Sequence, residues 1–137
     1  MRKLERQPQK ALVAVVDDDE SMRDTTKDLL ASAGFRTVTF ASAEAFLSSR
    51  HSASATALIA DMRMSGIDGL ALHLQLATSG NPFPTILVTA YPEEAVRTRA
   101  MEAGVLCYLA KPFAAEALLA YVGIAIRARR KRATRSR

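Results

Sequence analysis

Residues 11–23 read ALVAVVDDDESMR and join a run of apolar residues to a run of acidic ones. The apolar run, residues 12–16, has the length of a β-strand and carries no polar residue at alternate positions. A strand that is apolar on both faces is typical of a parallel sheet covered by helices on both sides. The acidic run therefore begins where a buried strand is expected to end.

Further apolar runs follow along the chain at the spacing of strands in the same sheet, at residues 37–40, 57–60, 86–89 and 105–109. Between the first two runs, apolar residues recur at helical spacing from Met22 to Ala33, before Gly34, which suits a left-handed helix end. Weaker helical patterns cover residues 43–49, 68–78, 95–103 and 114–125. Strand and helix thus alternate five times, which predicts a doubly wound α/β domain with right-handed crossovers.

The length of 137 residues, with 49% of them hydrophobic, allows one domain with a real core and is too short for two. We expect that domain to cover residues 11–126, between a basic extension at 1–10 and a basic tail or linker start at 127–137. The sequence has neither an apolar run of membrane-spanning length nor a secretory signal pattern. A soluble cytoplasmic protein is therefore expected.

The net charge of +5 is unevenly distributed along the chain. Because residues 1–10 carry +3 and residues 127–137 carry +7, residues 11–126 carry −5. Any binding of nucleic acid would depend on the ends and on phosphate contacts, since no aromatic residues interrupt the basic tail. For the domain alone nucleic acid is not the expected partner, and the tail is more readily a solubilising end or a linker.

The remaining reactive side chains give little sign of chemistry. Cys107 is the single cysteine, so it has no partner for an intramolecular disulfide and is expected to be a buried strand residue. His51 lies in a serine-rich segment predicted to be a loop, and His73 lies on a predicted helix without a second histidine. We expect both histidines to be solvated structural residues, and neither is expected to donate a phosphoryl group.

Polar side chains follow four of the five predicted strands. Asp17 and Asp18 come after the first, Asp61 after the third, Thr89 ends the fourth, and Lys111 follows the fifth. Because the carboxyl ends of parallel strands meet at one edge of a sheet, carboxylates, a hydroxyl and an ammonium group should gather there.

Carboxylates that converge in a partly buried cleft repel one another and stay ionised only if a positive charge compensates them. A set of oxygen ligands without cysteine or histidine favours Mg²⁺, with Mn²⁺ as a substitute. A carboxylate beside such an ion can attack phosphorus and form an aspartyl phosphate. The Lys111 ammonium and the Thr89 hydroxyl would then share the charge of the phosphoryl oxygens.

Four stretches, in this order and spacing, resemble the signatures of receiver domains of two-component response regulators: VVDDDESMR (15–23), LIADMRMSGIDG (58–69), ILVTAY (86–91) and CYLAKPF (107–113). The resemblance implies a flavodoxin-like (βα)5 fold, a three-layer sandwich with a five-stranded parallel sheet. The stretch FASAEAFL (40–47) is more similar to receivers of LuxR-type transcription factors than to chemotaxis-type ones.

By that resemblance Asp61 is the phosphoacceptor, loaded by a sensor histidine kinase or a small phosphodonor. Asp18 binds Mg²⁺ directly, Asp17 binds it through a water molecule, and the backbone carbonyl of Arg63 supplies a further ligand. The metal set therefore comprises Asp17, Asp18, Asp61 and Arg63. Such a domain is a regulatory phosphoacceptor that promotes its own phosphorylation and dephosphorylation, and it is not expected to be an enzyme.

The resemblance also assigns Lys111 and Thr89 as the groups that bind the phosphoryl group. Thr89 and Tyr108 form the switch, and the Lys111–Pro112 peptide bond is cis. Phosphorylation then changes the surface made by the fourth predicted helix, the fifth strand and the fifth helix. That surface would bind a downstream protein or a second copy of the chain. A stand-alone receiver and the N-terminal part of a transcriptional regulator are both open.

One loop departs from the family pattern. Met64-Ser65-Gly66 stands where the family usually has Met-Pro-Gly, so the loop lacks a fixed φ angle and should be more mobile. Arg63 and Tyr91 lie two residues beyond Asp61 and Thr89, where receivers vary and side chains can cover the phosphate. We hypothesise that these two residues set the dephosphorylation rate.

Taken singly, these residues have plainer interpretations. The acidic run could complement a helix N-terminus, Thr89 could be an ordinary strand residue, Lys111 a surface ammonium and Tyr108 part of the core. Only their combination favours a phosphoryl site. An aspartyl phosphohydrolase would need a second acid two residues beyond Asp61, where Arg63 stands, and a Rossmann nucleotide site would need a Gly-x-Gly-x-x-Gly motif after the first strand. A phosphorylation-independent docking or nucleic-acid-binding protein acting through its basic tail is the remaining alternative.

Overall fold

The computed structural model describes the backbone of residues 11–135 and the side chains of residues 11–129. The predicted N-terminal extension and the last two residues of the tail lie outside this range. The strands are β1 (Leu12–Val16), β2 (Arg36–Phe40), β3 (Ala57–Asp61), β4 (Thr85–Thr89) and β5 (Cys107–Ala110). The helices are α1 (Glu20–Ser32), α2 (Ala43–Leu47), α3 (His51–Ser54), α4 (Gly69–Thr78), α5 (Glu94–Glu102) and α6 (Ala115–Arg135).

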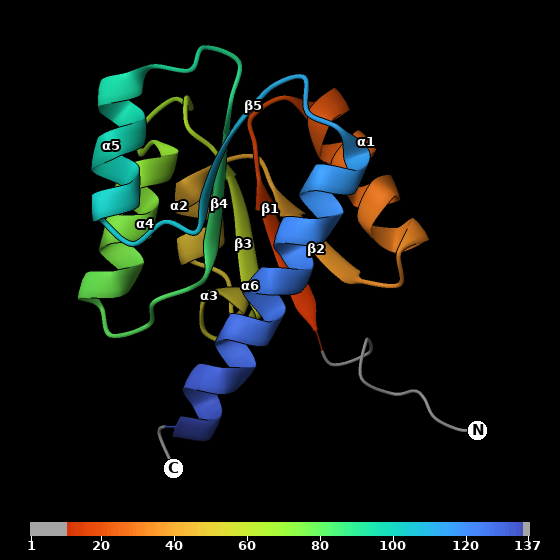
Figure 1. Ribbon diagram of the computed structural model, residues 1–137, viewed down its shortest axis with the longest axis vertical. Helices are drawn as coiled ribbons and strands as arrows, with labels where there is room; N and C mark the ends of the chain where they lie inside the picture. The colour runs from red at the N-terminus through yellow and green to blue at the C-terminus, as the bar shows by residue number, and fades with distance from the viewer. Residues whose placement is uncertain (1–10, 136–137) are drawn as a thin grey trace.

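The five strands form one parallel sheet in the order β2-β1-β3-β4-β5 (Figure 1). The order reverses at β1, which pairs with β2 on one side and with β3 on the other. In an open sheet of this kind, the crevice beyond the carboxyl ends of the strands is where ligands bind. The predicted fold, a doubly wound (βα)5 domain, is confirmed.

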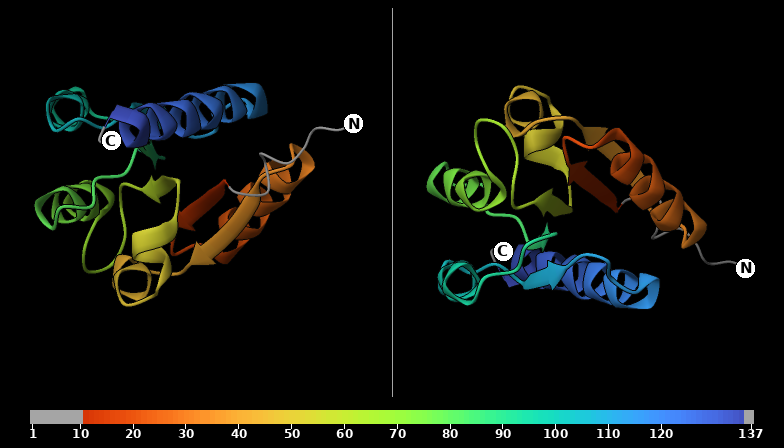
Figure 2. Two further views of the ribbon diagram at one scale, coloured as in Figure 1. Left: turned by 90° about the horizontal axis from the view of Figure 1, so that it is seen from below. Right: turned by 90° about the horizontal axis from the view of Figure 1, so that it is seen from above.

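The central strands are buried on both faces, as their continuous apolar runs predicted. Val13 packs toward Leu30 of α1 and Leu118 of α6, whereas its neighbour Ala14 faces the opposite core, which contains Leu72 of α4. Figure 2 shows α1 and α6 on one side of the sheet and α2 and α4 on the other. Because successive strand residues point to opposite faces, a single apolar run supplies both cores.

The helices differ from the prediction mainly at their ends. The serine-rich segment predicted as a loop forms the short helix α3, which begins at His51. The last helix, predicted to residue 125, continues to Arg135 and so includes most of the basic segment. Cys107 is buried on β5, as predicted. Within the described residues, none of the helices has the length and apolar character needed to cross a membrane.

The prediction that His73 is solvated is wrong. Its side chain is only 4% exposed, its Nδ1 lies 2.8 Å from the Thr85 hydroxyl, and its Nε2 lies 2.9 Å from the Ala103 carbonyl oxygen. Leu72 and Leu76, one residue before His73 and three residues after it, are also buried, so His73 stands on the inward stripe of α4. The imidazole therefore joins α4, β4 and the end of α5 as a satisfied buried polar group.

Candidate functional site

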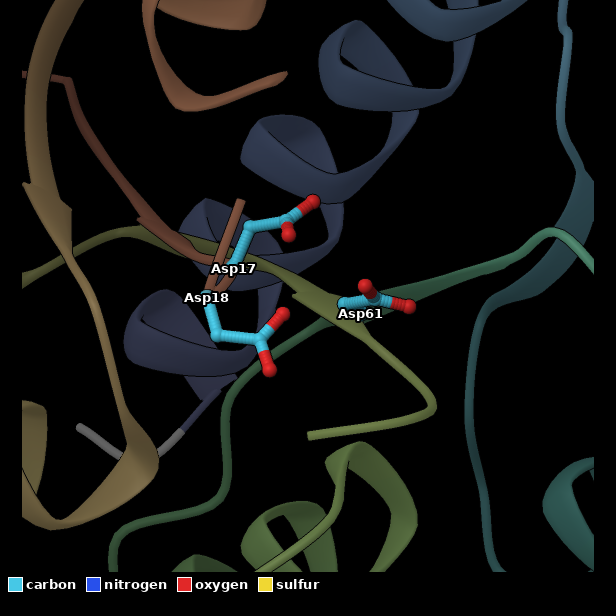
Figure 3. Close-up of side chains that lie close together, drawn as sticks. All are labelled: Asp17, Asp18 and Asp61. Carbon is cyan, nitrogen blue, oxygen red and sulfur yellow. The ribbon is translucent and has the colours of Figure 1, made fainter. Parts of the chain in front are cut away.

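Three carboxylates meet at the carboxyl edge of the sheet. Asp17 follows β1 and Asp61 ends β3, and these strands are parallel neighbours that pair Val16 with Ala60. One carboxylate oxygen from each of Asp17, Asp18 and Asp61 lies within 4.8 Å of the other two. Figure 3 shows the three carboxyl groups directed toward a shared space.

Local hydrogen bonds fix these acidic side chains differently. Asp17 is buried, and its Oδ1 accepts the Asp19 backbone N–H at 3.0 Å. Asp19 itself caps α1 by accepting N–H groups of the first turn, so the acidic run both caps a helix and supplies the cluster. Asp61 Oδ1 accepts the Arg63 backbone N–H at 3.3 Å. Asp18 is exposed, which leaves its carboxylate accessible to an incoming cation.

Lys111 reaches the cluster from the end of β5. Its Nζ lies 3.3 Å from Oδ2 of Asp17 and 3.3 Å from Oδ2 of Asp61. Burial alone would lower the pKa of Lys111, but the attraction of the two carboxylates outweighs burial and raises it. The Lys111 backbone N–H donates to the Thr89 carbonyl at 2.7 Å, and the Lys111–Pro112 peptide bond is cis. The ammonium is thus held charged between two buried acids.

The positive charge of one lysine does not balance this site. Burial and the neighbouring Asp17 raise the pKa of Asp61 above its usual value of 3.8, and Lys111 only partly opposes them. With Asp18 added, three carboxylates surround one ammonium group. The chemistry and spacing of these oxygen donors fit a hard divalent cation such as Mg²⁺.

Thr89 and Tyr108 stand beside the cluster on the next two strands. Thr89 ends β4 with 1% of its surface exposed, and its Oγ1 accepts the Tyr91 backbone N–H at 3.1 Å. Tyr108 is half-buried on β5 against the α4 side of the core. Its hydroxyl accepts the Glu93 backbone N–H at 3.2 Å, so its ring is held in the core while its polar end reaches the β4–α5 loop.

A cavity of about 490 Å³ opens beside Asp18 between the loop after β3 and the loop after β4. Arg63 and Tyr91 both line it, and the Arg63 guanidinium carbon lies 5.3 Å from the centroid of the Tyr91 ring. An Arg63 nitrogen also lies 3.8 Å from a Glu93 carboxylate oxygen. Both residues predicted to flank the phosphoacceptor therefore lie at the mouth of one cavity.

Sequence reasoning missed two residues that shape this edge. Gly69 begins α4 against the backbone of Asp61: a Cβ atom there would lie 2.6 Å from the Asp61 carbonyl oxygen. Glu93 contributes a carboxylate and a backbone N–H to the cavity wall. Glycine in the stretch LIADMRMSGIDG gave a signal for the first, whereas nothing local in the sequence distinguishes Glu93 from Glu94.

Comparison with known proteins places the whole arrangement in one family. Residues 13–123 match the response regulator receiver domain. The chain is 36% identical over 118 residues to the transcriptional regulatory protein FixJ of Bradyrhizobium diazoefficiens, covering 86% of this chain and 58% of FixJ. It also covers 54% of the nodulation protein W of the same organism, at 37% identity over 123 residues and 90% of this chain. The chain thus spans about half the length of these relatives.

Solved structures show the same likeness. The response regulator StyR superposes with a TM-score of 0.86 at 37% identity, covering 93% of this chain and 64% of StyR. The Vibrio cholerae chemotaxis protein CheY4 superposes with a TM-score of 0.75 at 26% identity, covering 84% of this chain and 98% of that protein. From its sheet, its acidic edge and these matches, the chain belongs to the response regulator receiver domain family.

Proposed function

We propose that this receiver accepts a phosphoryl group on Asp61 and uses the modification to change its protein partners. The observation that carries the proposal is the position of Asp61, whose carboxylate lies among two further carboxylates and 3.3 Å from the Lys111 ammonium. An acid with this surrounding has a nearby cationic group for the phosphoryl oxygens and a cation site beside it.

In the proposed transfer, an ionised Asp61 oxygen attacks phosphorus and forms a new P–O bond. The bond from phosphorus to the donor breaks at the same time, so that acetate leaves acetyl phosphate, or the imidazole nitrogen leaves the phosphohistidine of a sensor kinase. Lys111, already within hydrogen-bond distance of Asp61, would donate to a phosphoryl oxygen. Thr89, at the end of the adjacent strand, would donate its hydroxyl hydrogen to another.

The cation is the group the carboxylates would share. We propose that Asp18 holds Mg²⁺ directly and Asp17 through water, with Asp61 and the Arg63 carbonyl as further ligands; Mn²⁺ would occupy the same site. When bound, the ion supplies positive charge that offsets both the carboxylates and the transferring phosphoryl group. The exposure of Asp18 beside two buried acids supports this division of roles.

We infer that Thr89 and Tyr108 carry the signal away from Asp61. Movement of the Thr89 hydroxyl toward a phosphoryl oxygen would displace the Tyr91 N–H that it now accepts. The same loop contributes the Glu93 N–H that holds Tyr108, so a change at Thr89 reaches β5. A phosphoryl group that binds one arrangement better than the other shifts the population toward it. The face that changes is formed by α5, β5 and α6.

Partners follow from that face. We propose that a sensor histidine kinase loads the domain and that the α5–β5–α6 face then binds a downstream protein or a second copy of the chain. Residues 11–126 would form the receiver, in a cytoplasmic protein that acts as a regulator and not as an enzyme. The names of FixJ and of its relatives describe transcriptional regulators, which makes a role in transcription our proposal for the pathway. Similarity to receivers of LuxR-type regulators stays a prediction.

The rate of phosphoryl loss is proposed to depend on Arg63 and Tyr91. Water must reach phosphorus in line with the Asp61 oxygen for the phosphoryl group to leave as inorganic phosphate. The stacked Arg63 and Tyr91 side chains lie at the cavity mouth through which that water would pass. Replacing either residue by alanine should therefore change the lifetime of the phosphorylated protein.

The test of the proposed function is phosphoryl incorporation from acetyl phosphate, followed by intact mass with and without Mg²⁺. Wild type should gain one phosphoryl group in the presence of Mg²⁺, and Asp61→Asn should gain none. Asp28→Asn, which alters an exposed acid on α1, is the matched control and should behave as wild type. Folded wild-type protein that gains no phosphoryl group would refute the proposal.

A further inference from the structure

Arg63 is held away from Asp61 by groups on the opposite wall of the cavity. Its backbone N–H donates to Asp61, but its guanidinium crosses from the loop after β3 to the loop after β4. There it stacks on Tyr91 and lies 3.8 Å from the Glu93 carboxylate. The guanidinium is thus a mobile cation attached next to the phosphoacceptor and currently paired elsewhere.

Glu93 has a second contact of a different kind. Its backbone N–H donates to the Tyr108 hydroxyl at 3.2 Å, while its side chain pairs with Arg63. One residue therefore touches both the cation that flanks Asp61 and the aromatic ring on β5. The neighbouring Glu94 carries the same charge, begins α5 and lines a different cavity, beside Pro92 and Arg97.

We propose that Glu93 is a positioning residue that competes with the phosphoryl group on Asp61 for the guanidinium of Arg63, an inference that rests on the proposed function. In the unphosphorylated domain Glu93 holds Arg63 across the cavity. A phosphoryl group brings a charge of about −1.5 to −2 next to the Arg63 backbone, compared with about −1 on the Glu93 carboxylate. Arg63 then transfers to the phosphoryl oxygens.

The transfer of Arg63 has a consequence for Tyr108. Once its carboxylate loses Arg63, Glu93 is held less firmly, and so is the backbone N–H that it donates to Tyr108. Phosphorylation would thus reach β5 by two routes, through Thr89 and through Arg63. Because the Arg63–Glu93 pair is more than half exposed, the competition should change phosphoryl-group binding only by about two- to fivefold.

The experiment measures the affinity of the Mg²⁺-loaded domain for beryllofluoride, a tetrahedral mimic of a phosphoryl group. Glu93→Gln should bind beryllofluoride about two- to fivefold more tightly than wild type, because Arg63 no longer has a competing carboxylate. Glu94→Gln makes the same change of charge one residue away and should bind as wild type does. Thermal unfolding of each variant checks that the fold is unchanged.

A double-mutant cycle separates competition for Arg63 from simple repulsion between Glu93 and the phosphoryl group. In an Arg63→Gln background the effect of Glu93→Gln should disappear. An equal effect in both backgrounds, or no effect in either, would overturn the role of Glu93 while wild-type binding of beryllofluoride upholds the proposed function. Failure of the wild type to bind beryllofluoride with Mg²⁺ would overturn both.

Discussion

The two ends of β4 each carry a buried threonine, yet their surroundings differ in kind. At the start of the strand, the Thr85 hydroxyl lies between the His73 imidazole and the Phe83 carbonyl. At its end, Thr89 adjoins an edge where three carboxylates share one ammonium group. The first end closes its polar groups on one another, whereas the second keeps like charges together. The same sheet therefore serves stability at one edge and binding at the other.

The closed end should respond most strongly in stability. His73→Ala would leave the Thr85 hydroxyl and the Ala103 carbonyl without the imidazole and open space in the core, at a cost of about 2–4 kcal/mol. Urea denaturation measures the loss. Gln75→Ala, on the exposed side of the same helix, is the control and should cost less than about 0.5 kcal/mol. Equal small losses in both variants would break the comparison.

The open end should respond to its cation. Mg²⁺ at about one hundred times its dissociation constant should stabilise the wild type by about 2.7 kcal/mol, because it binds the folded state alone. Asp18→Asn should lose most of this gain, and EDTA should reverse it. The shift in Tm with Mg²⁺ is the measurement. A wild type whose Tm ignores Mg²⁺ would place no cation at the acidic edge.

Lys111 connects charge at the open end to reactivity. Lys111→Gln should lower the rate of phosphoryl incorporation about tenfold or more, since it removes an ammonium group from the phosphoryl oxygens. Incorporation should rise with pH as Asp61 ionises, and the rise should move to higher pH in the variant, because Lys111 is a group that lowers the pKa of Asp61. Lys27→Gln on α1 is the matched control, and a pH profile shared by all three proteins would contradict the assignment.

The smallest expected effect concerns the strain that the like charges impose. Since the folded domain raises the pKa of Asp61, the folded state binds the proton more tightly than the unfolded chain. Stability from this group is therefore full below the ordinary pKa of 3.8 and is lost as pH rises through the folded value. In EDTA at neutral pH, Asp61→Asn should melt a few degrees above wild type. The difference should vanish in acid, and a less stable variant at neutral pH would contradict the account.

Much of the open end could be predicted from sequence because its residues immediately follow strands. A parallel sheet brings those positions together whatever the intervening helices contain. Asp17, Asp61 and Lys111 needed only the strand ends to be placed within a residue or so, and the long apolar runs did that. Their combination, which no single residue would justify, also carried the resemblance to the family.

The parts that could not be predicted depend on contacts between distant segments. His73 looked like an isolated polar residue because its partners, Thr85 and Ala103, lie 12 and 30 residues away. Glu93 acts through loop geometry, and a loop has no periodicity that says which side chain faces a cavity. The extent of α6 also escaped prediction, because a basic run is compatible with either a helix or a tail.

The most direct test of the open edge identifies the residue that carries the phosphoryl group. Protein treated with acetyl phosphate and Mg²⁺ is reduced with borohydride, which converts an aspartyl phosphate to homoserine, and its peptides are then mapped by mass. The account predicts homoserine at position 61, dependent on Mg²⁺ and absent without acetyl phosphate. Homoserine at another aspartate, or a phosphoryl group that resists reduction, would show that the acidic edge does not work as proposed.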